Sequence, residues 1–153
     1  MKFLSFKIAI AAPIAKVYRT MLNERSFREW TSEFNPTSYF EGSWEKGSEI
    51  RFIGLDSEGK KGGIVGRIKE NTPEKFISIE YQGLIKDNKE LTKGPEVSEW
   101  IGSTENYTFS AGSGDATIVT VELEMTFGDH FVEYFESAWP RALNKLKEIC
   151  ERA

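Results

Sequence analysis

The sequence predicts an α+β fold in which a curved, seven-stranded antiparallel sheet wraps around one long C-terminal helix, with two short helices after the first strand. Apolar residues alternate with polar ones, at the period of two typical of strands, over residues 3–11 and again between residues 36 and 127. Pro13 opens a short helical pattern between these regions, and a long amphipathic pattern closes the chain. The apolar face of such a sheet needs the terminal helix as its cover.

The chain begins with one strand and two short helices. The strand is expected over residues 3–11, where apolar side chains recur at every second position. Proline is favoured at the first position of a helix, so Pro13 predicts a helix over residues 13–22 that ends at Asn23. A second short helix is expected over residues 24–30, and the two helices should form a V-shaped unit.

Six further strands should follow, separated by turns that contain Gly, Pro and Asp. They are expected at residues 37–42, 48–55, 61–71, 75–84, 98–110 and 116–128. Short turns join antiparallel neighbours, so these strands are predicted to form a meander. One connection is longer: residues 85–97 are polar and contain Gly and Pro. This pattern predicts a mobile loop or an insertion, and it makes the segment a candidate lid.

The alternation also assigns the two faces of the sheet. The apolar side chains that should face the terminal helix are Ile50, Phe52, Ile64, Ile68, Ile77, Ile79, Tyr81, Tyr107, Phe109, Val119, Val121, Leu123, Met125 and Phe127. Charged residues at the intervening positions should face water. The terminal helix carries a matching apolar stripe from Phe131 to Cys150. Pro140 should bend this helix, either because the helix curves over a curved sheet or because it has a hinge at a cavity mouth.

Length and composition predict a single domain over residues 1–153. The formal net charge is −4 and the basic residues are scattered, which argues against a nucleic-acid partner. No stretch approaches the roughly 20 apolar residues of a membrane span, so no membrane insertion is expected. Residues 3–12 do not resemble a signal peptide. The single Cys150 excludes an internal disulfide, and the expected location is therefore the cytoplasm.

No motif for catalysis or metal binding stands out in the sequence. His130 is the only histidine, and no nucleophile is signalled near it. Together with Asp129 and Glu133 it would form an incomplete set of metal ligands, so a solvated helix end is expected there. We therefore expect no catalytic residue, no metal and no cofactor.

Glu105 is the most informative polar residue, because it shares an alternation face with Tyr107 and Phe109. A carboxylate on the cavity side would be costly to bury unpaired and would have a raised pKa, which suits it to bind a ligand or to act as an acid or base. In the other interpretation, a one-residue bulge turns Glu105 to solvent or into a salt bridge. The sequence leaves both open.

Several segments carry a resemblance to a known family. They are Ile8–Tyr18, Phe27–Trp30, Trp44–Ser48 and Phe135–Leu146. On these segments the chain resembles the START-like, birch-pollen-allergen-like superfamily, also called SRPBCC or polyketide cyclase/dehydrase-like. Within it, the chain is most similar to homologues of the activator of the heat-shock protein 90 ATPase. The resemblance implies a helix-grip fold with a deep apolar cavity, in a superfamily whose members bind lipids, sterols or polyketides, catalyse cyclisation, or assist a chaperone. It supplies no common catalytic residue.

These observations favour a non-enzymatic protein that binds a small hydrophobic molecule, such as a lipid, a sterol or an aromatic polyketide-like compound, between the sheet and the terminal helix. The residues expected around this ligand are Trp30, Phe34, Phe52, Tyr81, Trp100, Glu105, Tyr107, Phe135 and Trp139. One alternative is a chaperone-activator-like module that binds a protein partner through an exposed patch. Another is a cyclase, dehydratase or hydrolase that uses Glu105 and the tyrosines. A monomer and a homodimer are both compatible with these functions.

Overall fold

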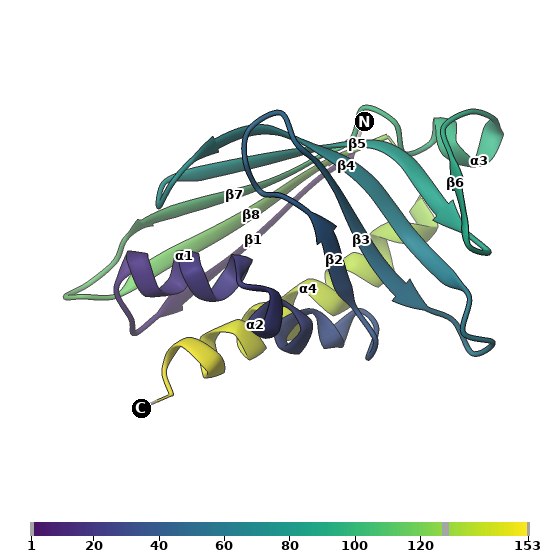
Figure 1. The fold of residues 1–153 in the computed structure, drawn as a ribbon. Helices are drawn as coiled ribbons and strands as arrows, with labels where there is room; N and C mark the ends of the chain where they lie inside the picture. Colours follow the sequence, from purple (N-terminus) through teal and green to yellow (C-terminus); the bar gives the residue numbers. More distant parts are fainter. Residues whose placement is uncertain (1, 127–128, 153) are drawn as a thin grey trace.

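A computed structural model describes residues 2–126 and 129–152; the side chains of Asp129 and His130 lie outside the described part. An open antiparallel sheet curves around the long C-terminal helix α4 (Asp129–Cys150), which passes along the inside of the curve (Figure 1). This arrangement confirms the predicted α+β helix-grip fold. Phe127, expected on the inner face, and the end of the strand predicted to reach residue 128 lie outside the described residues.

The first part of the chain follows the predicted order. Strand β1 (Lys2–Ile10) is followed by helices α1 (Ile14–Leu22) and α2 (Glu24–Trp30) and by the 3-10 turn η1 (Thr31–Glu33). Pro13 is the N-cap of α1 and has an extended backbone, so the helix begins one residue later than predicted. Asn23 separates the two helices, and its side-chain oxygen accepts hydrogen bonds from the amides of Arg25 and Ser26 in the first turn of α2.

The remaining strands are β2 (Tyr39–Gly42), β3 (Glu49–Leu55), β4 (Lys61–Thr72), β5 (Phe76–Lys86), β6 (Lys89–Leu91), β7 (Thr104–Ala111) and β8 (Thr117–Met125). The sheet order is β1-β8-β7-β5-β4-β3-β2, and β6 pairs with β5 outside this path. All described pairs are antiparallel. The predicted meander is therefore confirmed, with the first strand added beside the last.

The segment predicted as a long loop over residues 85–97 contains secondary structure. Its strand β6 forms a hairpin with β5, and the short helix α3 (Pro95–Ser98) follows. The next strand, β7, begins at Thr104 rather than at residue 98, because residues 98–103 fold into a turn that buries Trp100. The burial of Trp100 in this turn therefore shortens the strand that was predicted over residues 98–110. We call residues 86–98 the β6 arm.

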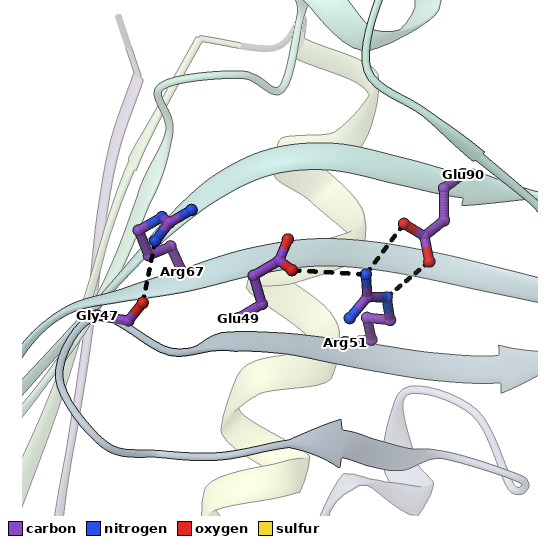
Figure 2. Close-up of polar contacts among 5 residues, drawn as sticks. All are labelled: Gly47, Glu49, Arg51, Arg67 and Glu90. Carbon is purple, nitrogen blue, oxygen red and sulfur yellow. Dashed lines mark hydrogen bonds and ion pairs between the residues drawn. The ribbon is translucent and has the colours of Figure 1, made fainter.

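One ion pair connects the β6 arm to a distant strand. Figure 2 shows the guanidinium of Arg51 on β3 facing the carboxylate of Glu90 on β6, with Nε–Oε2 and Nη2–Oε1 distances of 2.6 Å and 3.2 Å. In the sheet order, β4 and β5 lie between these two strands. Glu49 also approaches Arg51, at 3.9 Å, whereas Arg67 of β4 donates to the carbonyl of Gly47, just before β3 begins. The bidentate pair therefore connects the arm to β3 across two strands.

The main core lies between the inner face of the sheet and the helices. It contains Ile50, Ile68, Ile77, Ile79, Tyr81, Tyr107, Phe109, Val119, Val121, Leu123 and Met125, together with the apolar stripe of α4. All of these were predicted to face inward. A second, smaller cluster of Ile53, Val65 and Ile85, flanked by Tyr39, forms a separate group. Alternation along β3 places Ile53 on the outer face, opposite Phe52.

A β-bulge lets two residues of β5 face the same side. Val65 pairs with Gly83, but the next residue of β4, Gly66, pairs with Tyr81, so Gln82 is an extra residue on β5. Without this bulge, Tyr81 and Leu84 would point to opposite faces of the sheet, because they are three positions apart. With it, both line the inner side of the sheet.

Helix α4 continues through Pro140, which is exposed on the side of the helix away from the core. The missing amide of Pro140 is therefore placed where the helix faces water. Among the described helices, none is long and apolar enough to cross a membrane.

Candidate functional site

A cavity of about 720 Å³ lies between the inner face of the sheet and the helices α2 and α4. Its apolar walls come from α2, β3, β4, β5, the turn before β7, and α4. This volume falls within the roughly 300–1,000 Å³ range of small-molecule sites. Because the sheet curves away from the helix, the elements cannot meet everywhere, and the space between them remains open.

All nine side chains predicted to surround a ligand line this one cavity. They are Trp30, Phe34, Phe52, Tyr81, Trp100, Glu105, Tyr107, Phe135 and Trp139. Trp30 ends α2, Phe34 follows η1, and Phe135 and Trp139 lie one helical turn apart on α4. The structure therefore brings together residues that are up to 109 positions apart, counted from Trp30 to Trp139. Whether they contact a ligand remains a prediction.

The aromatic wall is packed to different degrees around the cavity. Trp30 and Trp139 are only 1% and 2% exposed, and their ring centroids are 6.0 Å apart. The indole of Trp30 also donates a hydrogen bond to the carbonyl of Met21 at 3.1 Å. Phe34 and Phe52 are partly accessible. The two tryptophans thus act as a fixed part of the wall, while the phenylalanines present more of their surface to the cavity.

Glu105 lies on the inner face of β7. It pairs with Ile79 of β5 and Leu123 of β8, both of which are fully buried, and β7 has no register shift against either neighbour. The interpretation in which a bulge turns Glu105 outward is therefore wrong: the bulges of this sheet lie between β4 and β5. Glu105 is partly accessible, and because it lines the cavity we assign this accessible surface to the cavity.

Two tyrosines donate hydrogen bonds to the Glu105 carboxyl group. The hydroxyl of Tyr81 donates to Oε1 at 2.5 Å, and the hydroxyl of Tyr107 donates to Oε2. Burial raises the pKa of Glu105 above its ordinary value, and the bonds from Tyr107 and Tyr81 act in the opposite direction because they stabilise the ionised form. Burial and the nearby Glu105 charge raise the pKa of both tyrosines well above the ordinary value, so both remain protonated donors.

Tryptophan rings lie beside both tyrosines of this group. The ring centroids of Tyr81 and Trp100 are 6.2 Å apart, and so are those of Tyr107 and Trp139. Phe135 packs near Trp100 at a centroid distance of 6.4 Å. The carboxyl group therefore belongs to a small polar group inside a largely aromatic chamber.

The sequence did not indicate the charged residues at the rim of the cavity. They lie on the β3–β4 and β5–β6 turns or at the strand ends beside them, and are Asp56, Lys60, Lys61, Lys86 and Asp87. The two turns are joined, since the backbone amide of Lys61 donates to the Asn88 side chain and the amide of Asn88 donates to the Lys61 carbonyl. Charged turn residues ordinarily serve solvation, so no sequence signal separated these from other turns.

Two further observations limit the chemistry of the site. Among the described residues, no group of three or more His, Cys, Asp or Glu side chains is arranged to hold a metal ion. The buried Nε1 of Trp139 has no hydrogen-bond partner within the described part of the chain. The polar chemistry of the inner chamber thus centres on Glu105 and its two tyrosines.

Comparison with known proteins identifies the family. The model of the family described as "Activator of Hsp90 ATPase homolog 1-like protein" matches residues 11–151. The chain belongs to this family. No curated protein matches the chain.

Solved structures of similar fold cover nearly the whole chain of this family member. The Aha1 dimer from Colwellia psychrerythraea is 20% identical with a TM-score of 0.72, over 99% of this chain and 97% of that one. Protein NE0264 from Nitrosomonas europaea is 21% identical with a TM-score of 0.71, over 95% and 92%. CalU16 from Micromonospora echinospora is 15% identical with a TM-score of 0.66, over 97% and 76%. At these identities the likeness establishes the helix-grip fold alone.

Proposed function

We propose that the protein binds a small, largely apolar molecule in the cavity between the sheet and α4, without transforming it chemically. The observation that carries this proposal is the cavity of about 720 Å³, whose aromatic wall encloses the hydrogen-bonded carboxyl group of Glu105. An apolar wall with a few convergent polar groups is typical of sites that hold small ligands. Lipids, sterols and aromatic polyketide-like compounds are the classes that we expect to fit.

Binding without catalysis is the simpler use of this geometry. A general acid–base reaction requires groups that exchange protons with the substrate. Both tyrosine hydroxyls that face Glu105 already donate their protons to its carboxyl group, so neither hydroxyl proton is available to a substrate. This arrangement supports an anchor for a ligand more directly than an acid and a base that act on separate atoms.

The proposal is tested by native mass spectrometry of protein purified without detergent, followed by a thermal-shift screen with fatty acids, sterols and flavonoids. A retained or stabilising compound is expected, because a ligand at 100 times its Kd stabilises the folded state by about 2.7 kcal/mol. The variant Leu84→Trp should reduce binding by filling the cavity that Leu84 lines. The variant Ile101→Trp makes a comparable change at a 42% exposed position outside the cavity wall and serves as its control. Absence of any retained or stabilising compound would contradict the proposal.

A chaperone-activator-like role is the second candidate, and the match to the family model favours it. Such a protein would bind its partner through its outer surface, and a homodimer is compatible with it because the similar Colwellia Aha1 protein is a dimer. The exposed edge strand β1, with Phe3 57% exposed, is one surface through which two copies could pair. Light scattering during size-exclusion chromatography measures the oligomeric state, and Phe3→Glu should reduce any dimer formed at this edge.

A further inference from the structure

We infer that the ligand is an organic amine, whose protonated nitrogen binds the Glu105 carboxylate while its apolar body lies among the aromatic side chains of the cavity. This inference rests on the proposed function and narrows its ligand: among lipids, sterols and aromatic polyketide-like compounds, it selects those that carry a basic amine. It follows from the hydrogen-bonding capacity, the charge and the aromatic surroundings of the polar group inside the cavity.

The polar group at Glu105 presents acceptors to a ligand. A carboxylate has about four lone-pair positions, two on each oxygen. One position on each oxygen is used by the hydroxyl of Tyr81 or Tyr107, which leaves further acceptor capacity on both. Each hydroxyl has spent its single proton on Glu105 and retains lone pairs only. A ligand that brings hydrogen-bond donors therefore fits this group, whereas a carbonyl, ether or carboxylate would find no free donor on these three side chains.

No cation of the described part of the chain forms an ion pair with Glu105. The lysines that line the cavity lie on its rim. Lys61 is the first residue of β4. Ile68, further along β4, pairs with Ile79 of β5, and Ile79 pairs with Glu105 of β7, so Ile68 marks the level of Glu105 in the sheet. Seven residues of strand separate the backbones of Lys61 and Ile68 by roughly 23 Å. A buried carboxylate without a cation is costly, and a cationic ligand would remove much of this cost.

The aromatic side chains around Glu105 also favour a positively charged ligand. Trp100 packs beside Tyr81 and Trp139 beside Tyr107, so an indole ring lies next to each tyrosine that donates to the carboxyl group. Ring faces attract cations, and tryptophan does so most strongly. An anionic ligand would be repelled by the carboxylate and by the ring faces. A neutral alcohol could donate one hydrogen bond but would bring no compensating charge.

The test compares three probes that share an aromatic body: 2-naphthylethylamine, 2-naphthaleneethanol and 2-naphthylacetic acid. Isothermal titration calorimetry at pH 7.5 measures their affinities for the full chain. The amine should bind at least about tenfold more tightly than the alcohol, as expected for a charge-assisted hydrogen bond to a buried carboxylate, and the acid should bind most weakly. Glu105→Gln should lower the affinity for the amine at least about tenfold and change the affinity for the alcohol much less.

Glu124→Gln is the matched control, since Glu124 is an exposed residue of the neighbouring strand β8 and lies outside the cavity wall. This variant should keep the order of the three affinities. If the alcohol or the acid binds as tightly as the amine, or if Glu105→Gln leaves the preference for the amine unchanged, the amine inference is overturned while ligand binding in the cavity stands. If none of the three probes binds, the amine inference is overturned, and the native mass spectrometry and thermal-shift screen decide separately whether the proposed function stands.

A second measurement keeps the test independent of how the variant folds. With the unmodified protein, the affinity for the amine should decrease as the pH is lowered through the pKa of Glu105, because protonation removes the negative charge, and the affinity for the alcohol should change little. The titratable groups that face Glu105 are Tyr81 on β5 and Tyr107 on β7, which stay protonated over this range, and α4 contributes the non-titrating Phe135 and Trp139. Amine and alcohol affinities with the same pH dependence would overturn the inference.

Discussion

Replacement of Trp139 by alanine distinguishes a packed cavity wall from a loose one. Trp139 is 2% exposed, and its ring lies 5.0 Å from Phe34, 6.0 Å from Trp30, 6.2 Å from Tyr107 and 6.4 Å from Phe6, measured between centroids. The side chain therefore has protein atoms on almost every side, although it also lines the cavity. Its removal should leave a void that the surrounding rings fill only in part.

The expected loss in the free energy of unfolding is about 3 to 5 kcal/mol, the range for truncation of a buried Phe or Trp to Ala. No hydrogen bond adds to this figure, because the Trp139 Nε1 has no acceptor among the described residues. For a chain of this length each kcal/mol lowers Tm by about 2–4 °C, so Tm should fall by about 6–20 °C.

Urea denaturation followed by far-UV circular dichroism measures the loss. Phe3→Ala is the control, because Phe3 is an aromatic residue of β1 that is 57% exposed, and its truncation should cost less than about 1 kcal/mol. If Trp139→Ala costs no more than Phe3→Ala, the reasoning is refuted, and Trp139 would be a wall residue that is supported on one side only.

Three further predictions concern the carboxyl group of Glu105, the β6 arm, and the close packing of the Gly63 backbone against the Phe52 carbonyl. Because burial raises the pKa of Glu105 in the folded state above its ordinary value of 4.5, the folded state retains the proton more strongly, and stability should fall as the pH rises from about 4.5 to the folded-state pKa. Urea midpoints between pH 4 and pH 8 should show this fall in the unmodified protein, and a Glu105→Gln variant with the same fall would contradict the assignment. Arg51→Ala should cost at most about 1 kcal/mol, since its ion pair with β6 is partly exposed, yet it should speed amide hydrogen exchange in the β6 arm. Arg67 is the control, because it donates to the carbonyl of Gly47 and not to the β6 arm, so Arg67→Ala should leave exchange in the arm unchanged. If both variants speed exchange in the arm equally, the Arg51–Glu90 ion pair does not hold the arm specifically. Gly63→Ala should prevent or strongly disturb folding, because its φ is +143° and a Cβ would lie 1.9 Å from the Phe52 carbonyl oxygen. Gly59→Ala, at a φ of +80° with no atom within 4 Å of the added Cβ, should cost only about 1 kcal/mol in thermal or urea unfolding.

The sequence predicted the inner face of the sheet well and the β6 arm poorly. Along β8, apolar residues alternate without interruption, and the structure places Val119, Val121 and Leu123 in the core as expected. Over residues 85–97, by contrast, a polar composition indicated only a loop. The hairpin and short helix there depend on pairing with β5 and on the burial of Val97, which is 0% exposed. Two of the three hairpin pairs, Ile85 with Glu90 and Lys86 with Lys89, join residues within the segment, but its polar composition lacks the apolar alternation that marks a strand.

The candidate site was predicted only in part, because contacts between strands cannot be read from the pattern of one strand. Alternation identified Tyr81, Glu105 and Tyr107 as residues of one face, but it left open whether Glu105 turned outward. The absence of a register shift in β7 decides this, as does the approach of the Tyr81 hydroxyl from another strand. The rim lysines carried no signal, because a charge on a turn has the same local pattern whether or not a cavity opens beside it.

Outside the β6 arm, the sequence by itself determined the order of the main strands and helices, the apolar face of the inner strands and the stripe of α4, because these follow from periodicities of two and of about 3.6 residues within short segments. Only the tertiary structure decided that a cavity of about 720 Å³ remains between sheet and helix, since its volume depends on how far the whole sheet curves. The register between strands likewise placed Glu105 within reach of Tyr81, 24 residues away. A bulge at Gln82 brought Tyr81 and Leu84 to the same side. Curvature, register and bulges arise from contacts between segments, which no local pattern contains.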